Sequence, residues 1–530
     1  MTITGQHLIA GTWRQENDAH FSSVDPRTKA NGKTIFADAS TEEVNKAVNH
    51  AAEAFAQTRH YSAEKLAHFL ETVADEIEAI GDELLTVCDG ETALGLPRLT
   101  GERGRTTNQL RAFAAHVREG SYVNAIIDTA LPDRTPAPRP DIRQMLRPIG
   151  PVAVFTPNNF PLAFGVAGGD TASAFAAGCP VIAKGHPSHP ATSELVAQAI
   201  HRAIEKCEFP QGYFSLLQGT GIEVGQTLVK HPDLAAVGFT GSLRGGRAIF
   251  DTATSRPTPI PVYAEMGSIN PVVILPDALA TRTSDLVSGV TGSVTLGSGQ
   301  FCTNPGLFFL LDSPEGKQFI ENVAGAMREQ APQILLNEGV EQSLQKGVSA
   351  LKDKNSVTLF TGGEVVNDTG FCYANTVMQT TGSAFLDDPT LQEEHFGPVT
   401  LFVLCDDMNQ LLTAIQSLGG QLTATIHASD AELDLAQLVV TILSSKAGRV
   451  LFNGYPTGVE VVHAMVHGGP YPATTVPNST SVGMTAIKRF LRPVAYQNLP
   501  DDLLPDALKD ANPLLIWRII DNQYSRDAIG

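Results

Sequence analysis

Positive charge, paired cysteines and long apolar runs are all scarce in this chain. Its 530 residues include 37 Lys plus Arg against 56 Asp plus Glu, and the formal net charge of −19 repels phosphate backbones and anionic lipid surfaces. The two closest of its six cysteines, Cys179 and Cys207, are 28 positions apart, which excludes a CxxC redox pair and a zinc-knuckle spacing. No run approaches the roughly 18 apolar residues of a membrane span, and the first residues lack the pattern of a signal peptide. We therefore expect no nucleic-acid partner, no metal site and no membrane span, and we expect the protein in the reducing cytoplasm.

The first third of the chain has the periodicity of helices. Hydrophobic residues make up 42% of the chain and charged residues 18%, which is a globular composition. Residues 40–43 read Ser-Thr-Glu-Glu, a capping-box pattern, and apolar residues follow at helical spacing as far as Phe55. The same spacing from residue 63 to 87 predicts a second, longer helix. Four prolines within residues 131–140 then predict an extended linker or arm.

Short apolar runs alternate with helical patterns in the middle of the chain. This alternation is typical of a parallel sheet covered by helices on both faces, in which ligands bind beyond the carboxyl ends of the strands. A second set of apolar runs between residues 270 and 470 predicts a second α/β domain. The predicted strands of the first sheet are 152–155, 181–183, 213–217, 234–239 and 262–264, with helices near 162–178, 189–206, 221–230 and 244–254, and those of the second domain include 272–275, 307–311, 401–404 and 449–452.

Six loop motifs occur in a fixed order between residues 156 and 399. They are TPNNFP at 156–161, KGHP at 184–187, FTGS at 239–242, EMGSINP at 265–271, GQFCTNPG at 299–306 and EEHFGPV at 393–399. Together they resemble the aldehyde dehydrogenase superfamily. Residues 163–174, the KGHP segment and the sequence HGGPYPAT at 467–474 are most similar to the branch of α-ketoglutaric semialdehyde (2,5-dioxovalerate) dehydrogenases, which also contains long-chain aldehyde dehydrogenases.

The resemblance implies a fold of three parts. These are a Rossmann-like dinucleotide-binding domain, a second α/β catalytic domain and a small bridging β arm that pairs subunits into a homodimer or homotetramer. The implied boundaries are 1–128 and 149–267 for the dinucleotide-binding domain, 268–475 for the catalytic domain, 129–148 and 484–503 for the arm, and 504–530 for a C-terminal tail without an assigned function.

Three residues take catalytic roles by this resemblance. Cys302 is the nucleophile, because a thiolate can add to an aldehyde carbon. Asn159 directs its side-chain amide at the developing oxyanion. Glu265 is the general base that activates water, and we expect partial burial to raise its pKa. The alternatives are a buried structural cysteine, a turn-stabilising asparagine and a surface acid at a strand end.

Six further residues are implied in binding NAD or NADP. Lys184 holds the adenosine ribose, and Thr240, Gly241 and Ser242 receive the pyrophosphate at a helix start. Glu394 and Phe396 hold the nicotinamide ribose and pack beside the ring. Both NAD and NADP remain possible cofactors, because Pro187 stands where the family has a Glu whose charge would repel the 2′-phosphate of NADP. His395 replaces the usual Ile, and we expect it to be solvated.

The predicted activity is NAD(P)-dependent oxidation of an aldehyde to a carboxylic acid through a cysteine thiohemiacetal and a thioester. The first candidate substrate is α-ketoglutaric semialdehyde (2,5-dioxopentanoate), with 2-oxoglutarate as product. That substrate requires a cationic anchor for its distal carboxylate, which the sequence assigns to no particular arginine. A long-chain aldehyde is the alternative and predicts an apolar channel near Phe160, Phe164 and residues 455–466. Acyl transfer to coenzyme A and an inactive binding or structural relative are further alternatives.

Overall fold

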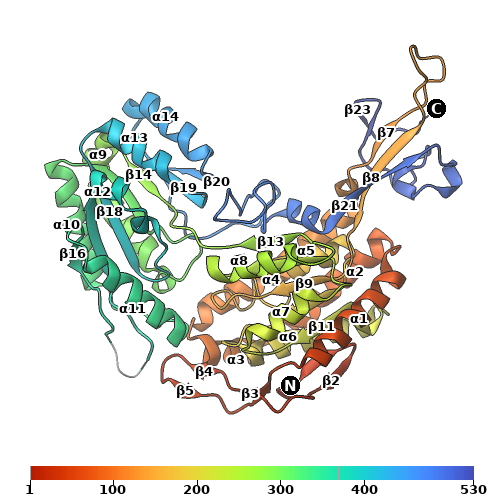
Figure 1. The fold of residues 1–530 in the computed structure, drawn as a ribbon, viewed down its shortest axis with the longest axis horizontal. Coiled ribbons are helices and arrows are strands. Elements are labelled where there is room, and N and C mark those ends of the chain that lie inside the picture. The colour runs from red at the N-terminus through yellow and green to blue at the C-terminus, as the bar shows by residue number, and fades with distance from the viewer. Residues whose placement is uncertain (1, 367–369, 530) are drawn as a thin grey trace.

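The computed structural model describes residues 2–366 and 370–529. Two large lobes, each built on a seven-stranded sheet, lie side by side, and a smaller sheet projects from the first lobe (Figure 1). This mixed α/β architecture confirms the predicted fold class.

The first sheet contains all five predicted parallel strands. Its order is β13-β12-β9-β10-β11-β1-β2. The chain adds β10 and β11 on one side of β9 and then returns to add β12 and β13 on the other side. Two antiparallel strands near the N-terminus, which the sequence did not predict, extend it past β11. The strands are β9 (Val152–Phe155), β10 (Val181–Lys184), β11 (Phe214–Leu217), β12 (Ala236–Thr240), β13 (Val262–Glu265), β1 (His7–Ile9) and β2 (Thr12–Arg14).

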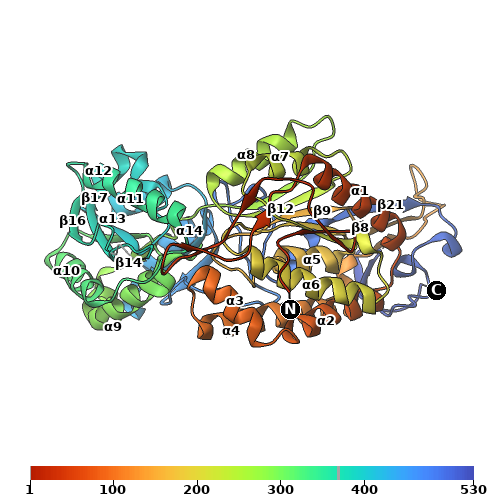
Figure 2. The same ribbon diagram turned by 90° about the horizontal axis from the view of Figure 1, so that it is seen from below.

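Helices cover both faces of this sheet (Figure 2). One face packs against α1 (Thr41–Thr58), α7 (Ile222–Lys230) and α8 (Leu243–Thr254), and the other packs against α2 (Ala63–Glu78), α4 (Leu96–Glu119), α5 (Gly169–Ala177) and α6 (Pro190–Lys206). The predicted capping box of α1 is present. The predicted helix at 63–87 is wrong in one respect: α2 ends, and α3 (Asp82–Thr92) begins after Gly81, whose φ of +70° interrupts the helix.

The second sheet has the order β16-β17-β18-β15-β14-β19-β20. It contains the four predicted strands, and β16, β17 and β19 are additional. The strands are β14 (Val272–Ile274), β15 (Leu307–Leu311), β16 (Thr358–Thr361), β17 (Thr376–Thr381), β18 (Val399–Cys405), β19 (Gln421–His427) and β20 (Ala447–Phe452). The helices around it are α9 (Pro276–Thr295), α10 (Pro314–Glu329), α11 (Glu338–Lys352), α12 (Gly382–Asp387), α13 (Met408–Ser417) and α14 (Leu433–Ser444).

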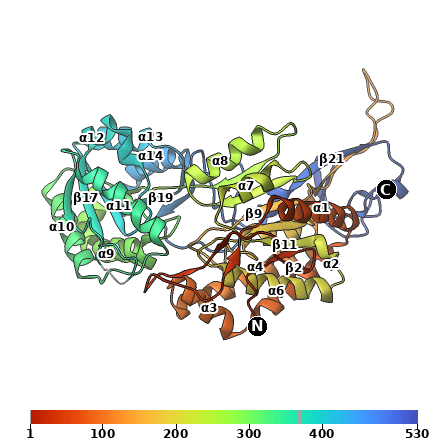
Figure 3. The same ribbon diagram turned by 60° about the horizontal axis from the view of Figure 1, so that its bottom comes forward.

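The projecting sheet joins distant parts of the chain. Its order is β21-β8-β7-β22-β23, built from β7 (Ile126–Asp128), β8 (Ile142–Pro148), β21 (Leu491–Gln497), β22 (Arg518–Ile520) and β23 (Gln523–Ser525). Strands β22 and β23 come from the C-terminal tail, to which the sequence assigned no structure. The proline-rich loop 131–140 extends away from this sheet (Figure 3). Within the described ranges, none of the helices combines the length and hydrophobicity that a membrane crossing requires.

Candidate active site

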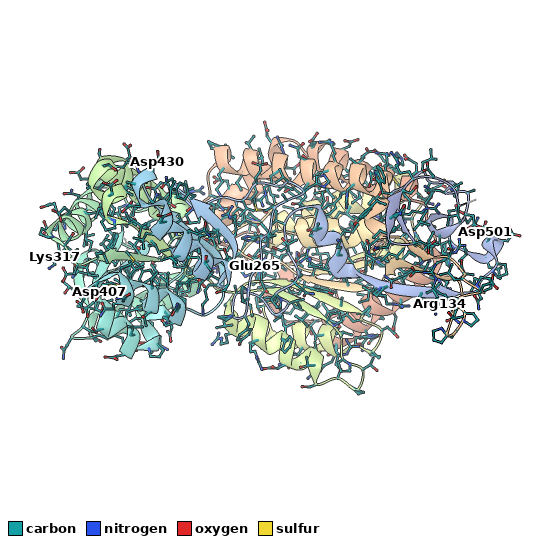
Figure 4. All side chains as sticks on the ribbon, turned by 90° about the horizontal axis from the view of Figure 1, so that it is seen from above. Arg134, Glu265, Lys317, Asp407, Asp430 and Asp501 are labelled. Carbon is teal, nitrogen blue, oxygen red and sulfur yellow. The ribbon has the colours of Figure 1, made fainter. Side chains whose placement is uncertain are left out.

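Four predicted site residues come together because they follow strands of one parallel sheet. Lys184, Thr240 and Glu265 are the last residues of β10, β12 and β13, and Asn159 lies in the loop after β9. Carboxyl ends of parallel strands meet at one edge of a sheet, which is the predicted position of the site. Figure 4 shows Glu265 at the junction of the two large lobes.

The loop that carries Cys302 comes from the second lobe, between the short turn η3 (Leu296–Gly299) and β15. The side-chain amide of Asn270 donates to the Cys302 carbonyl at 2.8 Å. Gly299 has a φ of +65°, and a Cβ at this position would clash with the carbonyl oxygen of Gly397. Only glycine fits such a close approach of two backbones. The loop is thus held by two neighbouring segments.

Cys302, His467 and Glu265 form a compact cluster. The Nε2 atom of His467 lies 3.3 Å from the Cys302 Sγ and 2.9 Å from Oε1 of Glu265. The Ser481 hydroxyl donates to the other oxygen of Glu265 at 2.5 Å. One imidazole nitrogen therefore faces both the thiol and the carboxylate, a geometry in which a proton can pass between them. Of the residues that the structure describes, the Cys, His and Glu of this cluster offer ligand atoms within 4.8 Å of one another, so the expectation of no metal site stays a prediction.

The electrostatics of the cluster favour a protonated thiol at rest. Cys302 is partly exposed, whereas the other five cysteines are buried. Burial and the nearby Glu265 carboxylate raise the pKa of the Cys302 thiol well above its ordinary value, and Arg105 partly opposes them. An activating base is therefore needed to form the thiolate.

The expected rise in the pKa of Glu265 is wrong. The side chain is buried, and burial alone would raise its pKa, but His467 and the Ser481 hydroxyl outweigh that effect. The pKa of Glu265 consequently lies below its ordinary value of 4.5. Glu265 remains ionised near neutral pH because its charge is paired and hydrogen-bonded.

Asn159 is buried beside the Cys302 loop. Its side-chain amide donates to the backbone carbonyl of Gln300 at 3.1 Å, and the backbone carbonyl of Asn159 accepts a hydrogen bond of 2.6 Å from Arg98. An amide group carries two hydrogens, so one of them can donate to an oxyanion while the other keeps this contact. The role of Asn159 stays a prediction.

The residues predicted to bind pyrophosphate surround the start of α8. Thr240 pairs with Glu265 across β12 and β13, and the Gly241 N–H donates to the Glu265 carbonyl at 3.1 Å. Ser242 caps α8 by accepting the Gly245 N–H at 3.2 Å. The N–H groups of the next two residues point along the helix axis without helical partners, and this turn is exposed. Such a helix start fits an anion like pyrophosphate.

Lys184 lies at the end of β10 in a half-buried position. Its ammonium group donates to the carbonyls of Gly185 and Gly219. Burial lowers the pKa of Lys184 to about 8, against the opposing charge of Asp38. A cation that is held by carbonyls next to the sheet edge fits the predicted contact with a ribose.

Glu394 and Phe396 line a cavity together with Phe301, the neighbour of Cys302. The two predicted residues for the nicotinamide end therefore lie beside the nucleophile's loop.

The expectation of a solvated His395 is wrong. A Cβ on Gly347 of α11 would clash with the His395 ring, and burial lowers the pKa of His395 to about 4. The ring is a packing element between α11 and this loop.

Sequence reasoning missed His467 and Ser481 as site residues. The HGGPYPAT segment was identified only as a mark of one branch, although a histidine within it was a visible signal. Ser481 had no signal, because its contact with Glu265 spans 216 positions of sequence.

The sequence matches the model of the aldehyde dehydrogenase family over residues 13–471. The chain therefore belongs to the aldehyde dehydrogenase family, whose members oxidise aldehydes with NAD or NADP.

Two curated relatives match the chain over nearly its full length. It is 47% identical over 532 aligned residues to "Alpha-ketoglutaric semialdehyde dehydrogenase 2" of Azospirillum brasilense, with 99% of this chain and 100% of the relative covered. It is 45% identical to "Alpha-ketoglutaric semialdehyde dehydrogenase" of Acinetobacter baylyi, with 99% of each chain covered. These matches confirm the predicted family and branch.

Solved structures support the fold. Betaine aldehyde dehydrogenase from Staphylococcus aureus in complex with NAD⁺ superposes with a TM-score of 0.80 at 20% identity, covering 94% of this chain and 96% of that chain. A 1-pyrroline-5-carboxylate dehydrogenase from Thermus with bound NAD gives a TM-score of 0.77 at 21% identity, covering 93% and 92%.

Proposed function

We propose that the protein oxidises α-ketoglutaric semialdehyde to 2-oxoglutarate with NAD or NADP as acceptor. The observation that carries the chemistry is the shared position of the His467 Nε2 atom, 3.3 Å from the Cys302 Sγ and 2.9 Å from Glu265. The substrate is supported by the two relatives with 47% and 45% identity, which are both named for this semialdehyde. The same relatives do not favour the long-chain aldehyde alternative.

Acylation begins at Cys302. In the tautomer that carries its hydrogen on Nδ1, His467 accepts the thiol proton on Nε2 as the sulfur attacks the aldehyde carbon, because the thiol is otherwise protonated near neutral pH. Glu265 stabilises the imidazolium that results, at a distance of 2.9 Å. The Asn159 amide donates to the oxyanion of the thiohemiacetal. NAD(P), when bound, supplies the hydride acceptor that turns the thiohemiacetal into a thioester.

Hydrolysis of the thioester uses the same buried pair. Once His467 has released the thiol proton to solvent, the Glu265 carboxylate takes a proton from the attacking water, and this proton returns through His467 to the Cys302 sulfur as the C–S bond of the thioester breaks. The Ser481 hydroxyl keeps the carboxylate oriented through its second oxygen. Water as the acceptor distinguishes this chemistry from acyl transfer to coenzyme A.

The residues present fit a dinucleotide. The exposed first turn of α8 at Ser242 would hold the pyrophosphate, together with the loop of Thr240 and Gly241. Lys184 would contact the adenosine ribose, and Glu394 and Phe396 would lie at the nicotinamide end beside Phe301.

We further propose that the segments of the chain have the predicted functions and that the protein forms a homodimer or homotetramer. Residues 1–128 and 149–267 bind the cofactor, residues 268–475 complete the catalytic site, and residues 129–148 and 484–503 pair subunits. The projecting sheet supports this assignment, because its edge strands β21 and β23 are open to pairing with another chain. The cytoplasm is the proposed location, supported by six free cysteines.

The test compares α-ketoglutaric semialdehyde, pentanal and decanal as substrates with NAD and with NADP, by the appearance of reduced cofactor. We expect the highest kcat/KM with the semialdehyde, no stimulation by coenzyme A, and no turnover by Cys302→Ala. A preference for decanal would replace the proposed substrate. Full activity in Cys302→Ala would refute the nucleophile.

A further inference from the structure

Two arginines of α4 lie on the same side of the helix, two turns apart. The Arg98 guanidinium lies over the rings of Phe160 and Phe301, 5.1 and 4.8 Å from their centroids. The Arg105 guanidinium lies over Phe164 at 5.3 Å and is 5.9 Å from the Phe160 centroid. Two cations therefore cover an aromatic wall that the fatty-aldehyde alternative would leave apolar.

The local charge on this helix face is positive. Glu102 lies between the two arginines in sequence, 3.9 Å from the Nε of Arg98. Its other oxygen accepts the N–H groups of Leu162 and Ala163 at 2.9 and 3.0 Å, so this carboxylate also orders the loop after β9. On this helix face, two guanidinium groups stand against one carboxylate, and the charges of Glu265 and Glu460 also act on Arg105 from other segments.

The guanidinium of Arg105 has N–H donors that could bind a ligand. Within the described part of the chain, its Nε and Nη2 atoms are buried without a hydrogen-bond partner. Arg98 donates to the backbone carbonyl of Asn159 at 2.6 Å and leaves one nitrogen, Nη1, without a partner among the described residues, whereas Arg105 leaves two. Arg449 is also near the site but donates to two carbonyls of the 455–466 loop at 3.0 and 2.6 Å. Buried donors without acceptors are unfavourable, and an anion that entered the cleft would satisfy them.

Phe164 connects Arg105 to the reacting group. Its ring lies 6.3 Å from the imidazole of His467, which in turn lies 3.3 Å from the Cys302 Sγ. The charge of Arg105 also lowers the pKa of Cys302, so the two groups share one electrostatic environment. The guanidinium and the nucleophile are thus linked through one aromatic ring and one imidazole, an arrangement that suits a short substrate with an aldehyde at one end and a carboxylate at the other.

We propose that Arg105 binds the distal carboxylate of a short aldehyde acid and sets the preference of the enzyme for that acid over uncharged aldehydes. The proposal rests on the proposed function for the identity of the acid, but not for the existence of the anion site. A guanidinium can bind a carboxylate through two parallel N–H donors, and stacking on Phe164 fixes its plane.

The experiment measures kcat/KM for three aldehydes of equal chain length: α-ketoglutaric semialdehyde, glutaric semialdehyde and pentanal. We expect Arg105→Met to lose about 30- to 100-fold with both acids and no more than about 3-fold with pentanal, as for the loss of a charge-assisted hydrogen bond. Arg105→Lys keeps the charge without the paired donors and should lose an intermediate amount. Arg111→Met is the matched control, because Arg111 lies on the same helix but pairs with Asp75 and Glu78.

Glutarate provides a second measurement that does not depend on which aldehyde is oxidised. We expect it to inhibit the wild type competitively and to inhibit Arg105→Met about 30-fold more weakly. Equal losses with all three aldehydes would mean that Arg105 only supports the aromatic wall, and unchanged glutarate inhibition would also overturn the anchor. If glutarate binds through Arg105 while the wild type shows no preference for the semialdehyde, the proposed substrate fails and the anion site stands.

Discussion

Replacing His467 by glutamine tests the proton transfer at the centre of the site. A glutamine amide can still donate to Glu265, so the buried carboxylate keeps a partner, but the amide cannot accept and hold the Cys302 proton. The substitution therefore separates general-base function from the structural pairing that the 2.9 Å contact provides. His463→Gln is the matched control, since His463 lies four residues earlier on an exposed part of the same segment, against His116.

The expected loss follows from the thiol. A cysteine with the ordinary pKa of 9.0 is about 3% thiolate at pH 7.5. Because burial and Glu265 raise the pKa of Cys302 further, the thiolate fraction without a base is smaller still. We expect His467→Gln to slow acylation at pH 7.5 by about 30-fold or more, within the range typical of a general base. The rate should then rise about tenfold per pH unit up to pH 9.

Two assays report this step. The first is the burst of reduced cofactor in stopped flow, and the second is alkylation of Cys302 by iodoacetamide without substrate. In the wild type the pKa of Glu265 lies below 4.5, so this group contributes no pH dependence between pH 6 and 9. In His467→Gln the pKa of Glu265 rises, because the imidazole that lowers it is gone, so the rates of the two proteins are compared at the same pH. If both rates in His467→Gln stay within a factor of three of the wild type at pH 7.5, the imidazole is not the base.

Three further perturbations have distinct expected outcomes. Glu265→Gln should keep the burst, because it removes a charge that raises the pKa of Cys302, but slow turnover about 100-fold and let the acyl-enzyme accumulate, as seen by mass spectrometry; an undetectable acyl-enzyme would exclude Glu265 from hydrolysis. Gly299→Ala should abolish alkylation of Cys302 with little change in circular dichroism, because its Cβ clashes with the backbone of Gly397, and normal alkylation would show that the loop adapts. Arg489→Met breaks the 2.8 Å buried pair with Asp170 and should lower the free energy of unfolding by about 3–5 kcal/mol in urea titrations, whereas a loss below about 1 kcal/mol would contradict an uncompensated buried charge.

The five parallel strands of the first sheet were predictable because they are largely buried on both faces. Residues 152–155 and 214–217 form continuous apolar or small-residue runs with every position buried, and such runs between helical patterns have few other interpretations. Strands β22 and β23 were not predictable, since each has three residues. Strand β22 is fixed by pairing with β7, almost 400 positions earlier, and among the described strands β23 pairs only with β22. The break at Gly81 was also missed, because the apolar period continues through α2 and α3 while one glycine changes the backbone.

The site residues were predictable to different degrees, depending on whether the signal for each residue is local in the sequence. Cys302 and Glu265 lie in short motifs, where neighbouring residues alone carry the signal. The contact between Cys302 and His467 spans 165 positions, and Arg105 acts through the face of a helix, so neither follows from local spacing. The pKa of Glu265 is lowered because its hydrogen-bonding partners outweigh its burial, so a prediction from burial alone gave the wrong direction of the shift.

Two requirements of the reaction conflict at Cys302, and the side chains of His467 and Arg105 relieve the conflict. Hydrolysis needs a carboxylate near the sulfur, yet that charge opposes ionisation of the thiol and repels an anionic substrate. His467 relieves the first effect, because its nitrogen lies between the two groups and can carry the proton that Cys302 loses. Arg105 relieves the second, because it offers the distal end of the substrate a positive charge beside the ring of Phe164. Removing either side chain should therefore affect substrates differently: loss of His467 slows every aldehyde, whereas loss of Arg105 slows the acids far more than pentanal.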